Sequence, residues 1–246
     1  MQELSGIAAM VGSAFLAAGL VKGVVGLGLP AVAMALLGLA MPPAEAASLL
    51  VVPTIVTNIW QLHAGPRIGA VTRRFATMMV AICAGIPLGI GLLTRGTYAT
   101  VVLGAVLVAY GAIGLIAPQF SIPKRAERWC SPLVGLVTGA VTGATAVGAV
   151  PLAPYLGSLD LDKEEIIQAL GLAFTVSMLA LAVGLALEAR FDAAAAGGSL
   201  LALLPALAGM ALGQRIRERM SPAAFRRWFF AGLLALGVYM VVRAFA

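Results

Sequence analysis

Apolar residues dominate the chain in runs of about 20, the length that crosses the hydrocarbon core of a bilayer as a helix. Within each run the apolar positions are continuous and do not alternate with polar ones, which excludes a β-barrel. The pattern predicts eight segments, at 5–40, 46–62, 75–93, 98–117, 132–157, 164–187, 193–213 and 225–245. The sequence therefore predicts an all-α, polytopic membrane protein.

Two of these segments, 5–40 and 132–157, are interrupted by glycine and proline and contain related phrases. Gly19-Leu-Val-Lys-Gly-Val-Val25 returns as Gly135-Leu-Val-Thr-Gly-Ala-Val141, and more glycine and then proline follow each copy. Doubled apolar segments with Gly/Pro interruptions are typical of the binding site of a transporter. We therefore expect two transmembrane repeats of four segments each, at 1–118 and 131–246, joined by a basic cytoplasmic linker at 119–130.

Composition supports the membrane class. Of the 246 residues, 61% are hydrophobic and 11% are charged, whereas a soluble domain is about 25% charged. The first segment lacks a positive n-region and is too long for a removable signal peptide. Cys83 and Cys130 show no metal-ligand spacing and are not expected to pair. We expect no metal, no cofactor and no nucleic-acid partner.

Arginine and lysine predict how the segments cross the membrane. If all eight cross once, the two faces receive almost equal positive charge, against the positive-inside rule. If the two interrupted segments are re-entrant, the loops at 63–74, 118–130, 158–163 and 214–227 share one face, and twelve positive residues lie there. Only Arg95, Arg190 and Arg243 remain opposite. Each half then has three crossings, which gives an inverted repeat; broken spanning helices are the alternative to re-entrant hairpins.

Lys22 is the only charged residue deep inside an apolar segment. Burying an ammonium in a membrane is costly, so such a residue is a functional hypothesis by default. We expect it to compensate the charge of an anionic substrate. The alternative is that its aliphatic stem lets the ammonium reach an interface.

Glycine and hydroxyl residues near the two interruptions complete the predicted substrate site. Backbone amides at glycines are expected to face an oxyanion at the ends of half-helices, although glycines four residues apart also permit close helix packing. Threonine hydroxyls are expected to donate to the same oxyanion, or else to bond to the carbonyl four residues earlier. The predicted site, with Lys22, consists of Gly23, Gly26, Gly28, Thr54, Thr57, Asn58, Thr138, Gly139, Thr142, Gly143, Thr145 and Thr175.

The acidic residues are interpreted as helix-start residues. Asp162 with Glu165 fits a capping box before the sixth segment, and Pro43 with Glu45 opens the second segment in the same way. Gln61 and His63 are interpreted as interfacial residues at the end of the second segment. The basic stretch from Arg215 to Arg227 is expected to orient the protein and to contact anionic lipid headgroups.

These residues together resemble the TauE/SafE family of sulfite and organosulfonate exporters, also called the toluene sulfonate uptake permease family. The resemblance rests on the phrase Gly19–Pro30, its partner Gly135–Pro154 and the start of the second segment, Ala46-Ala-Ser-Leu-Leu50. It implies a multi-pass permease of the bacterial inner membrane that moves sulfite, sulfonates or related sulfur-containing anions, driven by the proton gradient. The first glycine cluster, Val24–Gly28, is thinner in glycine than the family pattern, and Lys22 precedes it. This departure bears on which anion is carried.

We therefore expect a secondary transporter for a small anion, with its site between the two interrupted segments. Expected partners are the anion, protons as coupling ion, membrane lipids and a further copy of the chain. The alternatives are a transporter or channel for a non-sulfur anion such as a carboxylate, and a membrane scaffold that transports nothing. An enzyme is not expected, because one histidine and no intramembrane carboxylate pair offer no acid/base or metal constellation.

Overall fold

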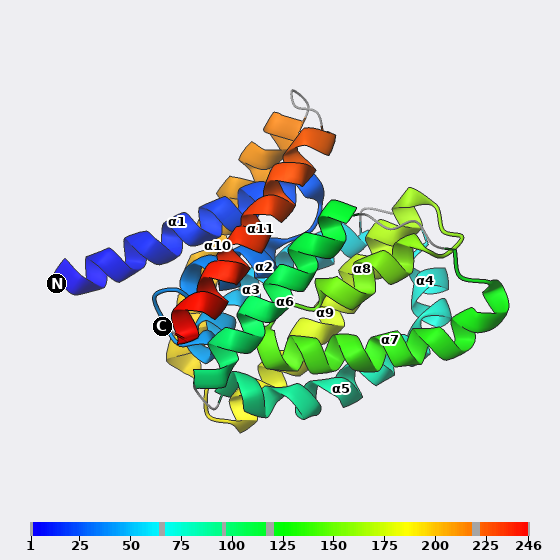
Figure 1. Cartoon of the computed structure of the whole chain (residues 1–246), viewed down its shortest axis with the longest axis horizontal. Coiled ribbons are helices and arrows are strands. Elements are labelled where there is room, and N and C mark those ends of the chain that lie inside the picture. Colours follow the sequence, from blue (N-terminus) through cyan, green and yellow to red (C-terminus); the bar gives the residue numbers. More distant parts are fainter. Residues whose placement is uncertain (1, 64–66, 95–96, 117–120, 218–221, 246) are drawn as a thin grey trace.

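A computed structural model describes residues 2–63, 67–94, 97–116, 121–217 and 222–245. Within these ranges the chain forms eleven helices and no strand. Their order is α1 (Gln2–Val25), α2 (Leu29–Leu37), α3 (Pro43–His63), α4 (Ile68–Arg74), α5 (Ala76–Thr94), α6 (Thr97–Ile116), α7 (Lys124–Thr145), α8 (Ala149–Gly157), α9 (Lys163–Leu187), α10 (Ala193–Arg217) and α11 (Pro222–Phe245) (Figure 1). In this part of the chain, α1, α3, α5, α6, α9, α10 and α11 are long and apolar enough to span a membrane. The all-α, polytopic prediction is confirmed.

Each interrupted segment is a long helix followed by a short one. The first breaks between α1 and α2, where Gly26 (φ 84°) and Gly28 (φ 102°) have left-handed backbone conformations that glycine adopts without strain. The second breaks between α7 and α8, where Ala146 (φ 59°) is the left-handed residue. The glycine and proline signals therefore mark the places where helical hydrogen bonding stops.

The basic linker predicted at 119–130 is partly helical, because α7 begins at Lys124. The run from Lys124 to Arg128 contains four charged residues and an alanine, all compatible with a helix, and it follows Pro123 at the N-cap. Glu127 in this first turn forms an ion pair with Arg74, Oε1 to Nε at 2.7 Å. The described part of the linker is thus the first turns of the second repeat.

Long helices from the two halves pack against each other. Helix α1 lies on α10 and α7 lies on α5, each pair running parallel. A Cβ built on Gly19 would lie 2.1 Å from the carbonyl oxygen of Ala206, and one built on Gly23 would lie 2.3 Å from that of Met210. Small residues at such positions let helix backbones approach closely in a membrane. The glycines spaced four residues apart in α1 and α7 are therefore packing positions on one face of each helix.

Helices that occupy the same place in each half run antiparallel where they meet. In the α3–α9 pair, Gln168 Nε2 donates to the carbonyl of Leu62 at 3.1 Å, and the later Gly171 faces the earlier Asn58. In the α6–α11 pair, Gly104 meets Gly237 while the later Gly111 meets Leu234. Both pairs therefore join one helix from each half in antiparallel orientation.

The structural register of the repeat differs from that of the doubled phrase. Gly209 of α10 approaches Leu16 and Leu20, and its counterpart in α5, Gly85, approaches Leu136 and Ala140. Leu16 and Leu136 are 120 positions apart, as are Leu20 and Ala140 and the N-cap residues Gly28 and Gly148, whereas Gly209 and Gly85 on the facing helices are 124 apart. The doubled phrase relates residues 116 apart, so it is one helical turn out of register. When the two helix breaks are aligned, Lys22 is equivalent to Thr142, whereas the doubled phrase pairs it with Thr138. Glycines every four residues make the phrase resemble itself after a shift of one turn.

Ion pairs connect three of the loops that the charge count assigned to one face. Arg67 Nη1 lies 2.7 Å from Glu165 Oε1, Lys124 Nζ lies 3.2 Å from Asp160 Oδ2, and Arg74 pairs with Glu127. The capping box of Asp162 and Glu165 is present at the start of α9, as predicted. We call the surface formed by these loops the basic face. Arg219, which was counted with it, and Arg95, which was counted against it, lie outside the described residues.

Candidate functional site

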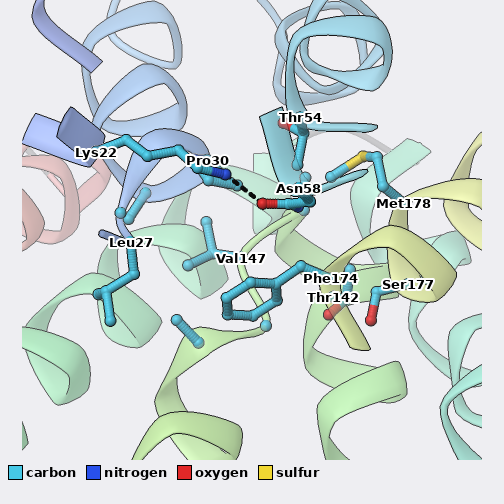
Figure 2. A pocket seen from close by; sticks show the side chains of 15 residues that line it. Lys22, Leu27, Pro30, Thr54, Asn58, Thr142, Val147, Phe174, Ser177 and Met178 are labelled. Carbon is cyan, nitrogen blue, oxygen red and sulfur yellow. Dashed lines mark hydrogen bonds between the residues drawn. The ribbon is translucent and has the colours of Figure 1, made fainter. Parts of the chain in front are cut away.

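Lys22 lies in the last turn of α1 and turns into the protein. Its relative exposure is 6%. Nζ donates to Thr57 Oγ1 at 3.0 Å and to Asn58 Oδ1, both on α3, and Figure 2 shows the bond to Asn58. No carboxylate lies within ion-pair distance of it among the residues that the structure describes. The side chain is thus held inside by neutral partners and does not reach an interface.

One side of Lys22 borders a small cavity of about 20 Å³ between the two helix breaks, which we call the central cavity. That volume accommodates about one water molecule. The polar side chains in its wall from the first half are Lys22, Thr54 and Asn58. Counted by the same offset of 120 positions, their counterparts in the second half are Thr142, Phe174 and Met178, which also line the cavity (Figure 2). The first half thus contributes an ammonium, a hydroxyl and an amide to the lining, and the counterparts in the second half are a hydroxyl, an aromatic ring and a thioether.

Several polar atoms in the lining of the central cavity lack a hydrogen-bond partner. Thr54 Oγ1, Asn58 Nδ2 and Ser177 Oγ are all buried and unpartnered. Leaving a buried donor unsatisfied costs about 1–3 kcal/mol, so native structures rarely leave three of them around one small cavity without a reason. Together with the third hydrogen of the Lys22 ammonium, these groups form a set of donors that a polar ligand would satisfy.

The two short helices also begin at the central cavity. Gly28 and Gly148 are the N-cap residues of α2 and α8, both line the cavity, and neither provides a side-chain cap. The first amides of such helices point out of the helix end and favour anions. A Cβ built on Gly148 would lie 2.2 Å from Thr142 Oγ1, so only glycine lets the α8 terminus come this close to α7.

The other side of Lys22 borders a larger cavity of about 520 Å³, which we call the vestibule. Its polar residues besides Lys22 and Thr57 are Gln61, Gln214 and Arg217. Gln61 Nε2 donates to the carbonyl of Gly26 at 3.1 Å and so fixes the end of α1. Because Arg217 ends α10 and the start of α9 contributes Ile166, the vestibule lies on the side of the basic face. Lys22 thus stands between the vestibule and the central cavity.

The structure gathers some of the predicted site residues around these cavities. Gly28, Thr54, Asn58 and Thr142 line the central cavity with Lys22, and Gly23, Gly26 and Thr57 line the vestibule. The amide of Gly26 donates to the carbonyl of Lys22 at 2.7 Å, so it is occupied within the chain.

The remaining predicted residues serve packing and backbone bonds in the described structure. Gly139 and Gly143 pack on α5 at Ile82 and Ile86. The hydroxyls of Thr142, Thr145 and Thr175 donate to the carbonyls of Thr138, Val141 and Gly171, each at 2.7 Å. Thr138 Oγ1 is buried and unpartnered beside Gly148. Thr142, Thr145 and Thr175 thus bond to the backbone of their own helices, which is the alternative to a ligand-facing hydroxyl.

Sequence reasoning did not assign Gln61, Gln214, Arg217, Phe174, Ser177 or Met178 to the site. One signal was present: Thr54, Asn58 and Gln61 are spaced i, i+4 and i+7, which places them on one face of α3. Phe174 and Met178 carried no such signal, because apolar residues of a span give no indication of which ones face a cavity.

A family model described as "Sulfite exporter TauE/SafE" matches residues 11–240 of the chain. No curated protein and no solved structure matches it. The family match covers both helix breaks and all of the residues that line the two cavities.

Proposed function

Since the chain belongs to the sulfite exporter TauE/SafE family, we propose that it is a secondary transporter for a small sulfur-containing oxyanion, sulfite or a sulfonate, in the bacterial inner membrane. The family consists of membrane permeases of the sulfite-exporter type, and the chain is a multi-pass helical membrane protein. One observation carries the assignment of the site. A buried ammonium, with no carboxylate partner among the described residues, stands among unpartnered donors where two half-helices begin.

In this proposal the anion enters from the vestibule, passes Lys22 and binds in the central cavity, which widens from its present volume of about 20 Å³ to admit it. There the anion supplies the missing hydrogen-bond partners. Lys22 Nζ balances the charge, while Asn58 Nδ2, Thr54 Oγ1 and Ser177 Oγ donate to the oxyanion oxygens. The first amides of α2 and α8 add further donors. Arg217 and Gln214 raise the local concentration of anions at the mouth of the vestibule.

We also propose that the halves form an inverted repeat in which the α1–α2 and α7–α8 segments are re-entrant. The antiparallel α3–α9 and α6–α11 pairs support it, as do the ion pairs that join the loops of the basic face. The three polar vestibule residues Gln61, Gln214 and Arg217 correspond to Leu181, Ile90 and Leu93, which are buried and packed. In the alternate state of the carrier, these three apolar residues would separate. The central cavity would then open to the side of the membrane opposite the vestibule.

Proton coupling belongs to the same proposal. Among the described residues that line the central cavity, Lys22 is the one titratable group. The vestibule on the other side of Lys22 contains one further ionisable residue among its described lining, Arg217. A carrier that loads its anion together with a proton would therefore hold the proton on Lys22. Transport driven by an imposed proton gradient tests this coupling.

A passive anion channel and a carboxylate transporter are the alternatives within the same class. Saturable flux with counterflow distinguishes a carrier from a channel. The apolar side chains of Phe174 and Met178 do not by themselves separate a sulfonate from a carboxylate, so a panel of both anions is required.

The test is substitution of Lys22 by methionine, with Lys124→Met as the matched control. Lys124 carries the same charge on the basic face, where its side chain is 79% exposed. In proteoliposomes we expect Lys22→Met to abolish anion uptake and Lys124→Met to leave it within twofold. Glu45→Gln, in the first turn of α3, is expected to have a milder effect than Lys22→Met. Wild-type uptake by a folded Lys22→Met protein removes Lys22 from the site.

A further inference from the structure

We propose that the central cavity selects singly charged oxyanions over doubly charged ones of the same shape. This inference rests on the proposed function and specifies the substrate class of that site. It follows from the number of charges that surround the cavity.

The wall of the central cavity contains one ionisable side chain, Lys22, among the described residues that line it. Its other polar members are hydroxyls and an amide, from Thr54, Asn58, Thr142 and Ser177. Arg217, the next cation along the path, lines the vestibule and not the central cavity. The side chains therefore supply a single positive charge.

The helix ends at the cavity add little net charge, because they occur in opposed pairs. The N-termini of α2 and α8 bring partial positive charge to it. The C-terminal ends of α1 and α7 bring partial negative charge to the same place, since Ala146, the C-cap of α7, lines the cavity and Lys22 lies in the last turn of α1. A break in a helix exposes free amides and free carbonyls at the same place. The cavity therefore gains hydrogen-bonding groups, while their partial charges nearly cancel.

A singly charged anion therefore makes the loaded site neutral. A doubly charged anion would leave one negative charge uncompensated in a small cavity whose lining includes the apolar side chains of Phe174 and Met178 (Figure 2). An unpaired charge in an apolar environment is strongly disfavoured. For sulfite this selects the hydrogen sulfite form, and sulfonates meet the condition directly because their single charge does not depend on protonation.

Three molecules of nearly the same tetrahedral shape separate charge from size: dimethyl sulfone is neutral, methanesulfonate carries one negative charge and sulfate carries two. Binding of each to the purified full-length protein is measured by thermal stabilisation and by competition with labelled sulfite in proteoliposomes. We expect methanesulfonate to bind at least tenfold more tightly than either of the others. Equal or tighter binding of sulfate overturns this inference and leaves the proposed function standing. Failure of sulfite and methanesulfonate alike to bind contradicts the proposed function, and this inference with it.

Thr142→Lys provides a second test, because Thr142 occupies the position that corresponds to Lys22. A second ammonium in the cavity should shift the preference between methanesulfonate and sulfate toward sulfate by at least tenfold, and Thr142→Met controls for side-chain size. An unchanged preference in a folded Thr142→Lys protein contradicts the inference that the number of positive charges at the cavity decides which anion binds. If that variant does not fold, the comparison of the three molecules on the wild-type protein decides.

Discussion

At the residue scale, the decisive feature is a lysine whose partners are neutral. Lys22 Nζ bonds to the side chains of Thr57 and Asn58, so it is oriented without being neutralised. An isolated buried charge is normally unfavourable, and a carboxylate partner would remove that cost. The described structure supplies none, and this leaves the positive charge available to a ligand.

Replacing Asn58 by aspartate is expected to put that partner in place. A carboxylate beside Nζ would neutralise the ammonium and repel anions, so the affinity for sulfite or methanesulfonate should fall by tenfold or more, about 1.4 kcal/mol at least. The unfolding temperature should stay the same or rise, because the ammonium gains a counter-ion. Both quantities are measured by thermal unfolding with and without anion. Asn58→Ala is the control: it loses the amide but keeps the positive charge, so its affinity should fall less than that of Asn58→Asp.

At the element scale, glycine has two distinct uses in the same segments. In α1 and α7 it lies at helix–helix contacts, as at Gly19 against Ala206. At the breaks it supplies backbone conformations or clearance, as at Gly28 and Gly148. Both uses follow from the missing Cβ, but they affect different properties, because the first sets the stability of a helix pair and the second shapes the site.

A leucine at Gly19 is expected to separate α1 from α10. Its Cβ would lie 2.1 Å from the backbone oxygen of Ala206, which cannot move without moving the helix. Overpacking of this kind costs roughly 1–3 kcal/mol or more, so the unfolding temperature in detergent should drop clearly. Gly12→Leu, in the same helix with nothing within 4 Å of the added Cβ, should be nearly neutral. Equal effects of the two substitutions would mean that α1 does not pack on α10 as described.

At the scale of the whole molecule, the two halves share one architecture but differ in chemistry. The first half supplies the ammonium and the amide of the central cavity, and the second supplies an aromatic ring and a thioether at the corresponding positions. The vestibule has a counterpart of packed apolar residues on the other side. Such a difference between related halves is expected of a carrier with one path open and the other closed.

Cysteine accessibility tests this arrangement in membranes, after Cys83 and Cys130 have been replaced. In the proposed topology the loops with Ile68 and Ile216 share one side of the membrane, so single cysteines at these positions should react with an impermeant reagent from that side. A cysteine at Leu39 should react only from the opposite side. A cysteine at Ile90 should be unreactive in the absence of anion and become reactive from the side of Leu39 during turnover. Labelling of positions 68 and 216 from opposite sides contradicts re-entrant segments and the inverted repeat.

Much of the architecture could be predicted from the sequence, because each prediction depended on local chemistry. Apolar runs give the spans, Pro43 and the Asp162 capping box give helix starts, and glycine marks the breaks. Lys22 stood out because a charged side chain inside a membrane segment costs free energy that a functional role would explain. The threonines of α7 were less informative, since a threonine that bonds to its own helix looks the same in sequence as one that faces a ligand.

By itself, then, the sequence determined the membrane class, the doubled helix breaks and Lys22 as the residue to explain, because these follow from hydrophobicity, backbone freedom and the cost of burying charge. Only the tertiary structure decided that Lys22 corresponds to Thr142, that Asn58 and Thr57 hold it, and that Phe174, Ser177 and Met178 complete the cavity. The physical reason is that these relations join helices distant in the chain. The alignment of α1 with α7 is set by the close contacts that their glycines make with α10 and α5. Sequence comparison cannot find this alignment, because glycines spaced four residues apart match equally well when the two copies are shifted by one helical turn.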